Sequence, residues 1–245
     1  DSVSAKQLTD ILDGASFSVD KVQLKGLKQR PAAPFITSTL QQEAWRKLRY
    51  GARKTMSIAQ QLYEGVTLGD QGSVGLITYM RTDSTNVSPV ALSEAKSYIE
   101  SNFGPEYTPK SPRLYKKKVK GAQEAHEAIR PTSITQAQDP SSVKKYLTSE
   151  QYRLYDLIWK RMLASQMPDA LFDSTSVEVS AETKTGTDYV FRANGSVLKF
   201  KGFRALYMEA SDDEEAGPEE GSRPLPELET GDGVKLDAIV PEQHF

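Results

Sequence analysis

The 245-residue sequence predicts a multidomain α+β protein in which a mostly helical domain is inserted into a β-rich domain. Apolar residues alternate with polar ones near both ends of the chain, whereas in the middle they recur at helical spacing. Pro34 and Pro168 lie close to where one pattern replaces the other. We therefore expect a discontinuous β-rich domain at 1–38 and 166–245 and a helical domain at 39–165, with a hinge at the two connections.

Five stretches show the alternation of a half-buried strand. They are 16–25, 177–181, 187–192, 196–200 and 234–240. Asn194 and Gly195 stand between two of these stretches, and this dipeptide favours the two-residue turn of a β-hairpin. The sequence therefore predicts a hairpin whose turn is Asn194 and Gly195.

Two short helices are predicted at the start of the helical domain. Thr39 and Gln42 have the spacing of a capping box, and Gly51 is expected to end the first helix. The apolar face of this helix would contain Leu40, Ala44, Trp45 and Leu48. The second helix is expected at 54–64, with Gly65 as its stop. Two helices joined by a tight turn resemble a helix-turn-helix, which alone is a weak sign of groove binding.

Two longer helices follow. Ser88 and Pro89 have the pattern of an N-cap and a first helical position. The apolar residues of that helix are Leu92, Ala95 and Ile99. Thr148 and Gln151 predict a capping box for the longest helix, which should end before Pro168. Its apolar stripe, predicted to lie in the core, contains Tyr152, Tyr155, Ile158, Trp159 and Met162.

The formal net charge of -2 conceals an uneven distribution. Between Trp45 and Arg130 there are fourteen Lys and Arg residues against eight Asp and Glu, whereas 209–229 holds nine acidic residues against Arg223 alone. The candidate phosphate contacts are Arg46, Lys47, Arg49, Arg53, Lys54, Lys116, Lys117, Lys118 and Lys120. The basic region therefore favours a nucleic-acid partner, and the acidic stretch is expected to be a flexible surface loop.

Several absences narrow the class of protein. The sequence has no cysteine, which excludes disulfides and thiolate metal sites from it. It has no apolar run long enough to span a bilayer, so we expect no membrane partner and a cytoplasmic protein. No phosphate-binding loop of nucleotide hydrolases occurs, and no close pair of aspartates in a strand-loop setting would bind magnesium. We therefore expect no metal or cofactor site within the chain.

The candidate catalytic residues are Tyr79 and Arg81, in the stretch ITYMRTDSTN at 77–86. If this stretch begins as a strand, residues two apart project from the same face, so the phenol and the guanidinium would lie side by side. A neighbouring arginine favours the phenolate and can hold phosphate oxygens bidentately. This pair has the chemistry for nucleophilic attack on a phosphodiester.

The residues after this pair are turn-forming and polar, and we expect Thr82, Asp83 and Ser84 to contact DNA. A second candidate pair is His126 and Arg130. On a short helix they would share a face and present two donors to one phosphate, with Pro131 ending the helix. The neighbouring Glu124 and Glu127 would either orient these side chains or only keep the helix soluble.

Three stretches of the chain resemble the signature segments of the bacterial type IA DNA topoisomerases, in the same order and at similar spacing. They are PFITSTLQQEA at 34–44, ITYMRTDSTN at 77–86 and EAHEAIRPT at 124–132, and the closing PEQHF at 241–245 is also similar. The resemblance implies that Tyr79 attacks one DNA strand and becomes linked to its 5′ phosphate. It also implies that Arg81 contacts the scissile phosphate and that His126 assists DNA binding.

The resemblance has further implications for fold and cofactor. The helical domain would form part of a gate-like arch and swing away to let a DNA strand pass. Magnesium and the general acid and base would come from a preceding Toprim domain, so the chain would be a fragment that lacks this domain and the C-terminal region. The intact enzyme would be an isomerase that relaxes negatively supercoiled DNA without ATP, and the fragment alone would bind DNA weakly.

Two other classes of enzyme that use a catalytic tyrosine need different arrangements of residues. A tyrosine recombinase would need several dispersed Arg and His residues around a tyrosine near the end of the chain, and a rolling-circle nuclease would need a paired-histidine metal site. Neither arrangement is present. A DNA-binding or hinge module without chemistry of its own, and a decatenating relative of the relaxing enzyme, remain open.

Overall fold

The computed structural model describes residues 2–115, 126–184, 186, 188–209 and 224–240. The expected lysine cluster at 116–120, Glu124, most of the acidic stretch and the closing PEQHF lie outside these residues. The chain forms two compact units. Unit 1 comprises Asp1–Lys28, Leu171–Phe200 and Gly217–Phe245, and unit 2 comprises Gln29–Ala170 and Lys201–Ala216. The stretches 29–38, 166–170 and 201–209, predicted in the β-rich domain, lie in unit 2.

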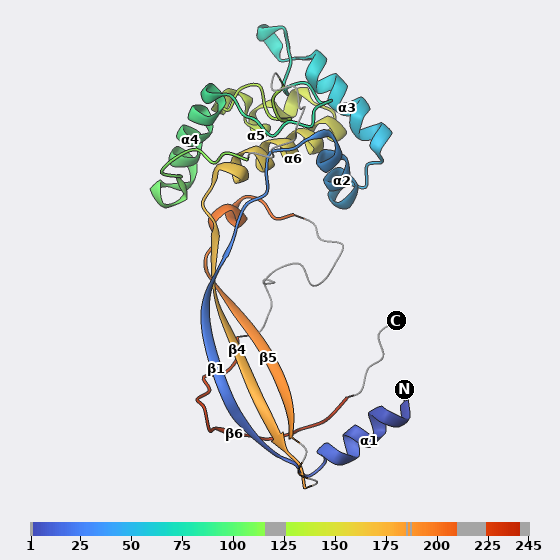
Figure 1. Ribbon diagram of the computed structural model, residues 1–245. Helices are drawn as coiled ribbons and strands as arrows, with labels where there is room; N and C mark the ends of the chain where they lie inside the picture. The colour runs from blue at the N-terminus through green and yellow to red at the C-terminus, as the bar shows by residue number, and fades with distance from the viewer. Residues whose placement is uncertain (1, 116–125, 185, 187, 210–223, 241–245) are drawn as a thin grey trace. The chain divides into compact units, whose positions relative to one another are not determined.

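Unit 1 is built on a four-stranded sheet with the strand order β5-β4-β1-β6. Its elements are α1 (Ser2–Leu12), β1 (Ser16–Gln29), β4 (Ala170–Glu182), β5 (Asp188–Phe200) and β6 (Gly233–Val234). Figure 1 shows β1, β4 and β5 as long strands that run side by side. The strand predicted at 16–25 is confirmed, whereas α1 was not predicted and only Gly233–Val234 of the stretch 234–240 pairs as a strand.

The hairpin predicted at Asn194 and Gly195 is wrong. Both residues lie inside β5, where Asn194 pairs with Ser176 and Gly195 pairs with Thr175 of β4. The chain instead reverses between Glu182 and Asp188. Pairing β5 over its whole length with β4 satisfies more backbone groups than two short strands around a tight turn, so the long ladder overrides the local turn preference.

Unit 2 contains the other helices of the described residues. They are α2 (Thr37–Leu48), α3 (Ala52–Glu64), α4 (Pro89–Phe103), α5 (Pro140–Val143) and α6 (Ser149–Gln166). Five single 3₁₀ turns lie at Gly69–Gln71, Pro105–Tyr107, Gln136–Gln138, Lys144–Tyr146 and Gly202–Ala205. The short strands β2 (Val66–Thr67) and β3 (Ser73–Val74) form a hairpin after α3. The helix α6 packs against α2, α3 and α4, so it forms the centre of the unit.

The longest predicted helix is confirmed together with its cap. The Thr148 hydroxyl accepts a hydrogen bond from Gln151 N at 3.2 Å, and Gln151 Oε1 accepts one from Thr148 N at 2.9 Å. Of the predicted stripe, Tyr155, Ile158, Trp159 and Met162 are buried. The cap of α4 is also as predicted, because the Ser88 hydroxyl accepts from Ala91 N at 3.4 Å. Gly65 ends α3 as expected.

The start and the inner face of α2 differ from the prediction. The N-cap is Ile36, and the Thr39 hydroxyl accepts a hydrogen bond from Ile36 N at 3.0 Å, so Thr39 is the third helical residue rather than the cap. Trp45, predicted to be inward, is 55% exposed. Glu43 is buried instead, where it accepts a hydrogen bond from the Tyr207 hydroxyl at 2.8 Å. Leu40 and Ala44 are buried as predicted, so the hydrogen bond from Tyr207 adds Glu43 to the buried face while Trp45 lies outside it.

The boundary between α2 and α3 also differs. Arg49, at φ 58°, occupies the left-handed position that ends α2, and Gly51 is the N-cap of α3. The Thr55 hydroxyl donates to Gly51 O at 3.1 Å, which ties the first turn of α3 to this cap. Gly51 therefore begins the second helix, which starts at Ala52 rather than near position 54.

Candidate functional site

The candidate nucleophile lies in an irregular segment at 76–86 rather than at the end of a strand. The only ladder contact in this segment is an isolated bridge between Ile77 and Pro131, so the predicted strand is wrong within the described residues. The side chains nevertheless alternate. Tyr79 is 41% exposed and Arg81 is exposed, whereas Met80 is 0% and Thr82 is 8% exposed. The phenol and the guanidinium therefore both face solvent, separated by an anchored methionine.

The backbone that carries Tyr79 and Arg81 is held by the stretch 34–44, the first of the three signature stretches and here called the first motif; 77–86 is the second and 124–132 the third. The Thr37 hydroxyl donates to Met80 O at 2.8 Å, and Thr82 N donates to the Thr37 oxygen at 2.9 Å. The backbone of Thr37 in turn donates to Thr82 O at 2.9 Å. Thr37, in the first turn of α2, thus fixes the main chain on both sides of Arg81.

The third motif fixes the other end of the segment. Thr78 N donates to Arg130 O at 2.9 Å, and the Thr78 hydroxyl donates to Ala128 O at 2.6 Å. Arg130 N donates to the Thr78 oxygen at 3.0 Å. An antiparallel bridge between Phe35 and Ile129 joins the first and third motifs directly. Three motifs that are far apart in the sequence therefore meet around the tyrosine.

His126 and Arg130 do not share a face, because the residues from 126 to 130 are not helical. His126 is exposed, whereas Arg130 is 8% exposed. The prediction of a short helix with two donors for one phosphate is therefore wrong in its geometry. The backbone at 128–130 is irregular. Ile129 bridges to Phe35 and Arg130 N donates to Thr78, and in this conformation the Arg130 side chain lies inside the protein.

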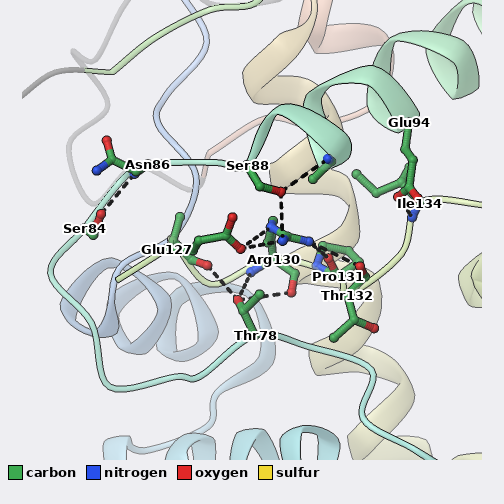
Figure 2. Close-up of polar contacts among 12 residues, drawn as sticks. Thr78, Ser84, Asn86, Ser88, Glu94, Glu127, Arg130, Pro131, Thr132 and Ile134 are labelled. Carbon is green, nitrogen blue, oxygen red and sulfur yellow. Dashed lines mark hydrogen bonds and ion pairs between the residues drawn. The ribbon is translucent and has the colours of Figure 1, made fainter. Parts of the chain in front are cut away.

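The Arg130 guanidinium is surrounded by acceptors, as Figure 2 shows. Its Nε donates to Glu127 Oε2 at 2.9 Å, and Nη2 also pairs with this carboxylate. Nη1 donates to Pro131 O at 2.7 Å, and Nη2 donates to Ser88 Oγ at 3.2 Å. Because Ser88 caps α4, Arg130 braces the start of this helix against the third motif. Glu127 thus orients Arg130 rather than a surface histidine.

The polar residues after Arg81 have different surroundings. The Thr82 hydroxyl accepts a hydrogen bond from Ser84 N at 3.0 Å, and Ser84 Oγ accepts one from Asn86 N at 3.1 Å. The hydroxyls of Thr82 and Ser84 therefore stabilise the conformation of the loop. Asp83 is exposed. The Thr85 hydroxyl donates to Tyr115 O at 2.5 Å, which adds a further anchor behind the loop.

The half-buried Tyr115 and the buried Tyr207 donate hydrogen bonds within unit 2. The Tyr115 hydroxyl donates to Ser165 O at 2.7 Å and to Pro31 O at 3.2 Å, and burial raises the pKa of this phenol to about 12. Burial, with the hydrogen bond to Glu43, also raises the pKa of Tyr207. Desolvation lowers the pKa of the nearby Lys47 amine, although its pairing with Glu43 at 3.6 Å opposes this effect. These tyrosines stay protonated and serve as hydrogen-bond donors.

The basic side chains of α2 and α3 are partly engaged. Lys54 pairs with Glu150, and the Arg49 guanidinium lies 5.9 Å from the centre of the exposed Trp45 ring. No group of three or more His, Asp or Glu side chains suited to a metal ion occurs among the described residues. In the same part of the chain, no helix combines the length and apolar character that crossing a membrane requires.

The residues that hold the site were not predicted. Thr37 and Thr78 carry the hydrogen bonds described above, and the ring of Tyr63, in the last turn of α3, lies against the ring of Tyr79. Thr37 lies within the stretch 34–44, but no sequence pattern indicates that its hydroxyl bonds to the segment that carries Tyr79. Nothing in the local pattern marks Tyr63, because its contact depends on how the chain returns after α3.

The family comparison agrees with this arrangement. A model of the DNA topoisomerase family matches residues 1–245, the whole of the sequence. The class is therefore that of a DNA topoisomerase, and the chain belongs to its bacterial type IA family. More particularly, it corresponds to part of a bacterial DNA topoisomerase I.

Individual relatives give the extent of this match. DNA topoisomerase 1 of Rickettsia felis is 48% identical over 241 residues, which cover 98% of this chain and 30% of that protein. DNA topoisomerase 1 of Xylella fastidiosa strain Temecula1 is 51% identical over 227 residues, or 93% of this chain and 27% of that protein. The structure of full-length topoisomerase I from Thermotoga maritima matches with a TM-score of 0.73 and 38% identity, over 96% of this chain and 35% of that chain. The chain thus spans about a third or less of these proteins.

Proposed function

We propose that this chain supplies the nucleophile of a type IA topoisomerase, which cuts one strand of negatively supercoiled DNA, passes a strand through the gap and reseals it. The observation that carries the proposal is the exposure of Tyr79 and Arg81 on either side of the buried Met80. A nucleophile and a cationic phosphate ligand are thereby presented together, while Thr37 and Thr78 hold the main chain that bears them. Preorganised charge of this kind stabilises a phosphoryl-transfer transition state.

The proposed step is a transesterification. The Tyr79 oxygen forms a bond to the phosphorus of the 5′ phosphate, and the bond from this phosphorus to the 3′ oxygen of the neighbouring nucleotide breaks. The proton of the phenol is lost and a proton is gained by the leaving 3′ oxygen, so a free 3′ hydroxyl results. Arg81 pairs with the non-bridging phosphate oxygens as their charge grows. The reverse reaction reseals the strand without ATP, because one phosphodiester replaces another.

Other parts of the enzyme complete this site. On the family resemblance, we assign magnesium and the proton-transfer groups to a Toprim domain of the intact enzyme. When bound, magnesium would supply positive charge near the DNA phosphates. Because the chain covers only about 30% of the Rickettsia felis protein, we expect the isolated chain to bind DNA weakly and to lack full activity.

The remaining roles follow from exposure. Among the described residues, His126 and Asp83 are exposed, and we propose that they contact single-stranded DNA beside the cut. Arg130, Thr82 and Ser84 are proposed to act indirectly, by shaping the loop that carries Arg81. The helical unit is proposed to swing as part of a gate, and the enzyme is proposed to work in the cytoplasm on the bacterial nucleoid.

The test uses the full-length protein that carries this chain. A labelled single-stranded oligonucleotide is incubated with magnesium, the reaction is stopped with detergent, and protein-linked DNA is separated on a gel. Tyr79→Phe should abolish the adduct and leave DNA affinity nearly unchanged, because only the phenol oxygen is removed. Tyr146→Phe, at a tyrosine of similar exposure, is the control. An adduct that survives in Tyr79→Phe on another residue, located by peptide mass spectrometry, would refute the proposal.

A further inference from the structure

The ring of Tyr63 lies 5.4 Å from the ring of Tyr79, centre to centre, with an angle of 64° between the planes. This is an edge-to-face contact, the geometry that aromatic pairs favour. Tyr63 and Tyr79 are each 41% exposed as residues, so the contact lies at the surface and not in the core. A half-exposed tyrosine rotates between side-chain conformers unless a neighbour selects one.

The backbone fixes the distance between the two tyrosines. Leu76 N donates to Leu62 O at 2.7 Å, which joins the last turn of α3 to the start of the tyrosine segment. At Gly75 a Cβ atom would lie 2.7 Å from Tyr63 O, so only glycine allows the two main chains to approach this closely. The hairpin of β2 and β3, in which Val66 pairs with Val74, returns the chain to this point.

We propose that Tyr63 is a positioning residue for Tyr79, and that its ring holds the phenol in the conformer from which the oxygen attacks the phosphate. This inference rests on the proposed function. Attack requires the oxygen in line with the bond that breaks, and a conformer that is already populated removes the cost of selecting it. Tyr63 touches the nucleophile and needs no contact with DNA to act.

The experiment compares Tyr63→Leu and Tyr63→Phe in the full-length protein. The single-turnover rate of adduct formation is measured at saturating oligonucleotide, and DNA affinity and melting temperature are measured in parallel. We expect Tyr63→Leu to slow adduct formation about fivefold with unchanged affinity, because an aromatic pair contributes on this scale. Tyr63→Phe keeps the ring and should cleave at the wild-type rate. Tyr146→Leu, at a tyrosine 38% exposed, is the matched control and should have no effect.

The possible outcomes separate the two proposals. If the wild type forms the Tyr79 adduct and Tyr63→Leu matches its rate, the positioning role is refuted and the proposed function stands. If Tyr63→Leu loses DNA affinity in proportion to its rate of adduct formation, the ring serves DNA binding and the positioning role is refuted. If Tyr63→Phe is as slow as Tyr63→Leu, the hydroxyl rather than the ring is needed, and the positioning role is again refuted. A wild type without a Tyr79 adduct refutes both proposals. Should Tyr63→Leu melt early, Tyr63→Gln is measured in its place and judged by the same criteria.

Discussion

The tyrosine segment at 76–86 and the histidine segment at 126–132 are both irregular, and they are hydrogen-bonded to each other through Thr78. They use their arginines in opposite ways. Arg81 faces solvent and makes no ion pair with any described residue, whereas Arg130 is 8% exposed and donates to Glu127, Pro131 and Ser88. One arginine is free to meet a phosphate, and the other has its donors satisfied inside the protein.

This contrast teaches that the residue type does not decide the role. A buried guanidinium must find acceptors for its donors, since an unpaired buried charge is costly. The carbonyls of Pro131 and Thr132, within 3.3 Å, and the Glu127 carboxylate supply them. No described residue provides such acceptors for Arg81, which leaves its guanidinium available to a ligand. The following substitutions test this division, in order of decreasing effect.

The largest effect is expected for Arg130→Ala, which should lower the free energy of unfolding by about 3 kcal/mol, because it removes the ion pair with Glu127 and the hydrogen bond to Ser88. Urea unfolding followed by tryptophan fluorescence reports on unit 2, since both tryptophans of the sequence, Trp45 and Trp159, lie in it. Arg81→Ala is the matched control and should change stability by less than ~0.5 kcal/mol. Equal stabilities of the two variants would contradict the view that Arg130 has a structural role and Arg81 does not.

The next effect is on chemistry. In the full-length protein, Arg81→Ala should slow adduct formation roughly 30-fold, equivalent to ~2 kcal/mol for a lost charge-assisted hydrogen bond. DNA affinity should fall much less, since one phosphate contact among many is removed. Single-turnover cleavage and fluorescence anisotropy measure the two quantities. An equal loss of affinity and rate would show that Arg81 only anchors DNA.

A smaller effect on stability is expected at Tyr115, whose carbonyl accepts a hydrogen bond from Thr85 of the loop. Tyr115→Phe removes the hydrogen bonds to Ser165 and Pro31 and should cost about 1–2 kcal/mol at pH 7. Burial raises the folded-state pKa of Tyr115 to about 12, above its ordinary value of about 10, so its stabilising contribution is complete below about pH 10. Above that pH the unfolded wild type ionises first, and the stability gap between wild type and Tyr115→Phe should shrink up to pH 12. Urea unfolding at several pH values measures the gap, and a constant gap contradicts the raised pKa.

The smallest effect is expected for the exposed histidine. His126→Ala in the full-length protein should weaken binding of single-stranded DNA about threefold, because one exposed contact beside the cut is lost. Stability should stay within ~0.5 kcal/mol of the wild type, in contrast to Arg130→Ala. Anisotropy titration and urea unfolding measure both. If affinity and cleavage are unchanged, His126 has no role at the site.

Local sequence patterns predicted the elements whose own residues determine them. The Thr148 and Gln151 box and the Ser88 cap were found because a cap and its partner lie within one turn of each other. The hairpin was wrongly predicted at Asn194 because the local turn preference does not show that the distant strand β4 pairs with the same backbone groups. Trp45 was placed inward because apolar spacing cannot reveal that Tyr207 would bury Glu43 instead.

By itself, the sequence determined the family, the helices with local caps and the candidate pair of Tyr79 and Arg81, since motifs and capping signals are written in neighbouring residues. Only the tertiary structure decided that Arg130 is a buried brace, that Thr37 and Thr78 hold the tyrosine segment and that Tyr63 lies against Tyr79. These roles depend on contacts between residues as far as 52 positions apart. Burial and hydrogen-bond partners across such separations arise only when the chain has folded.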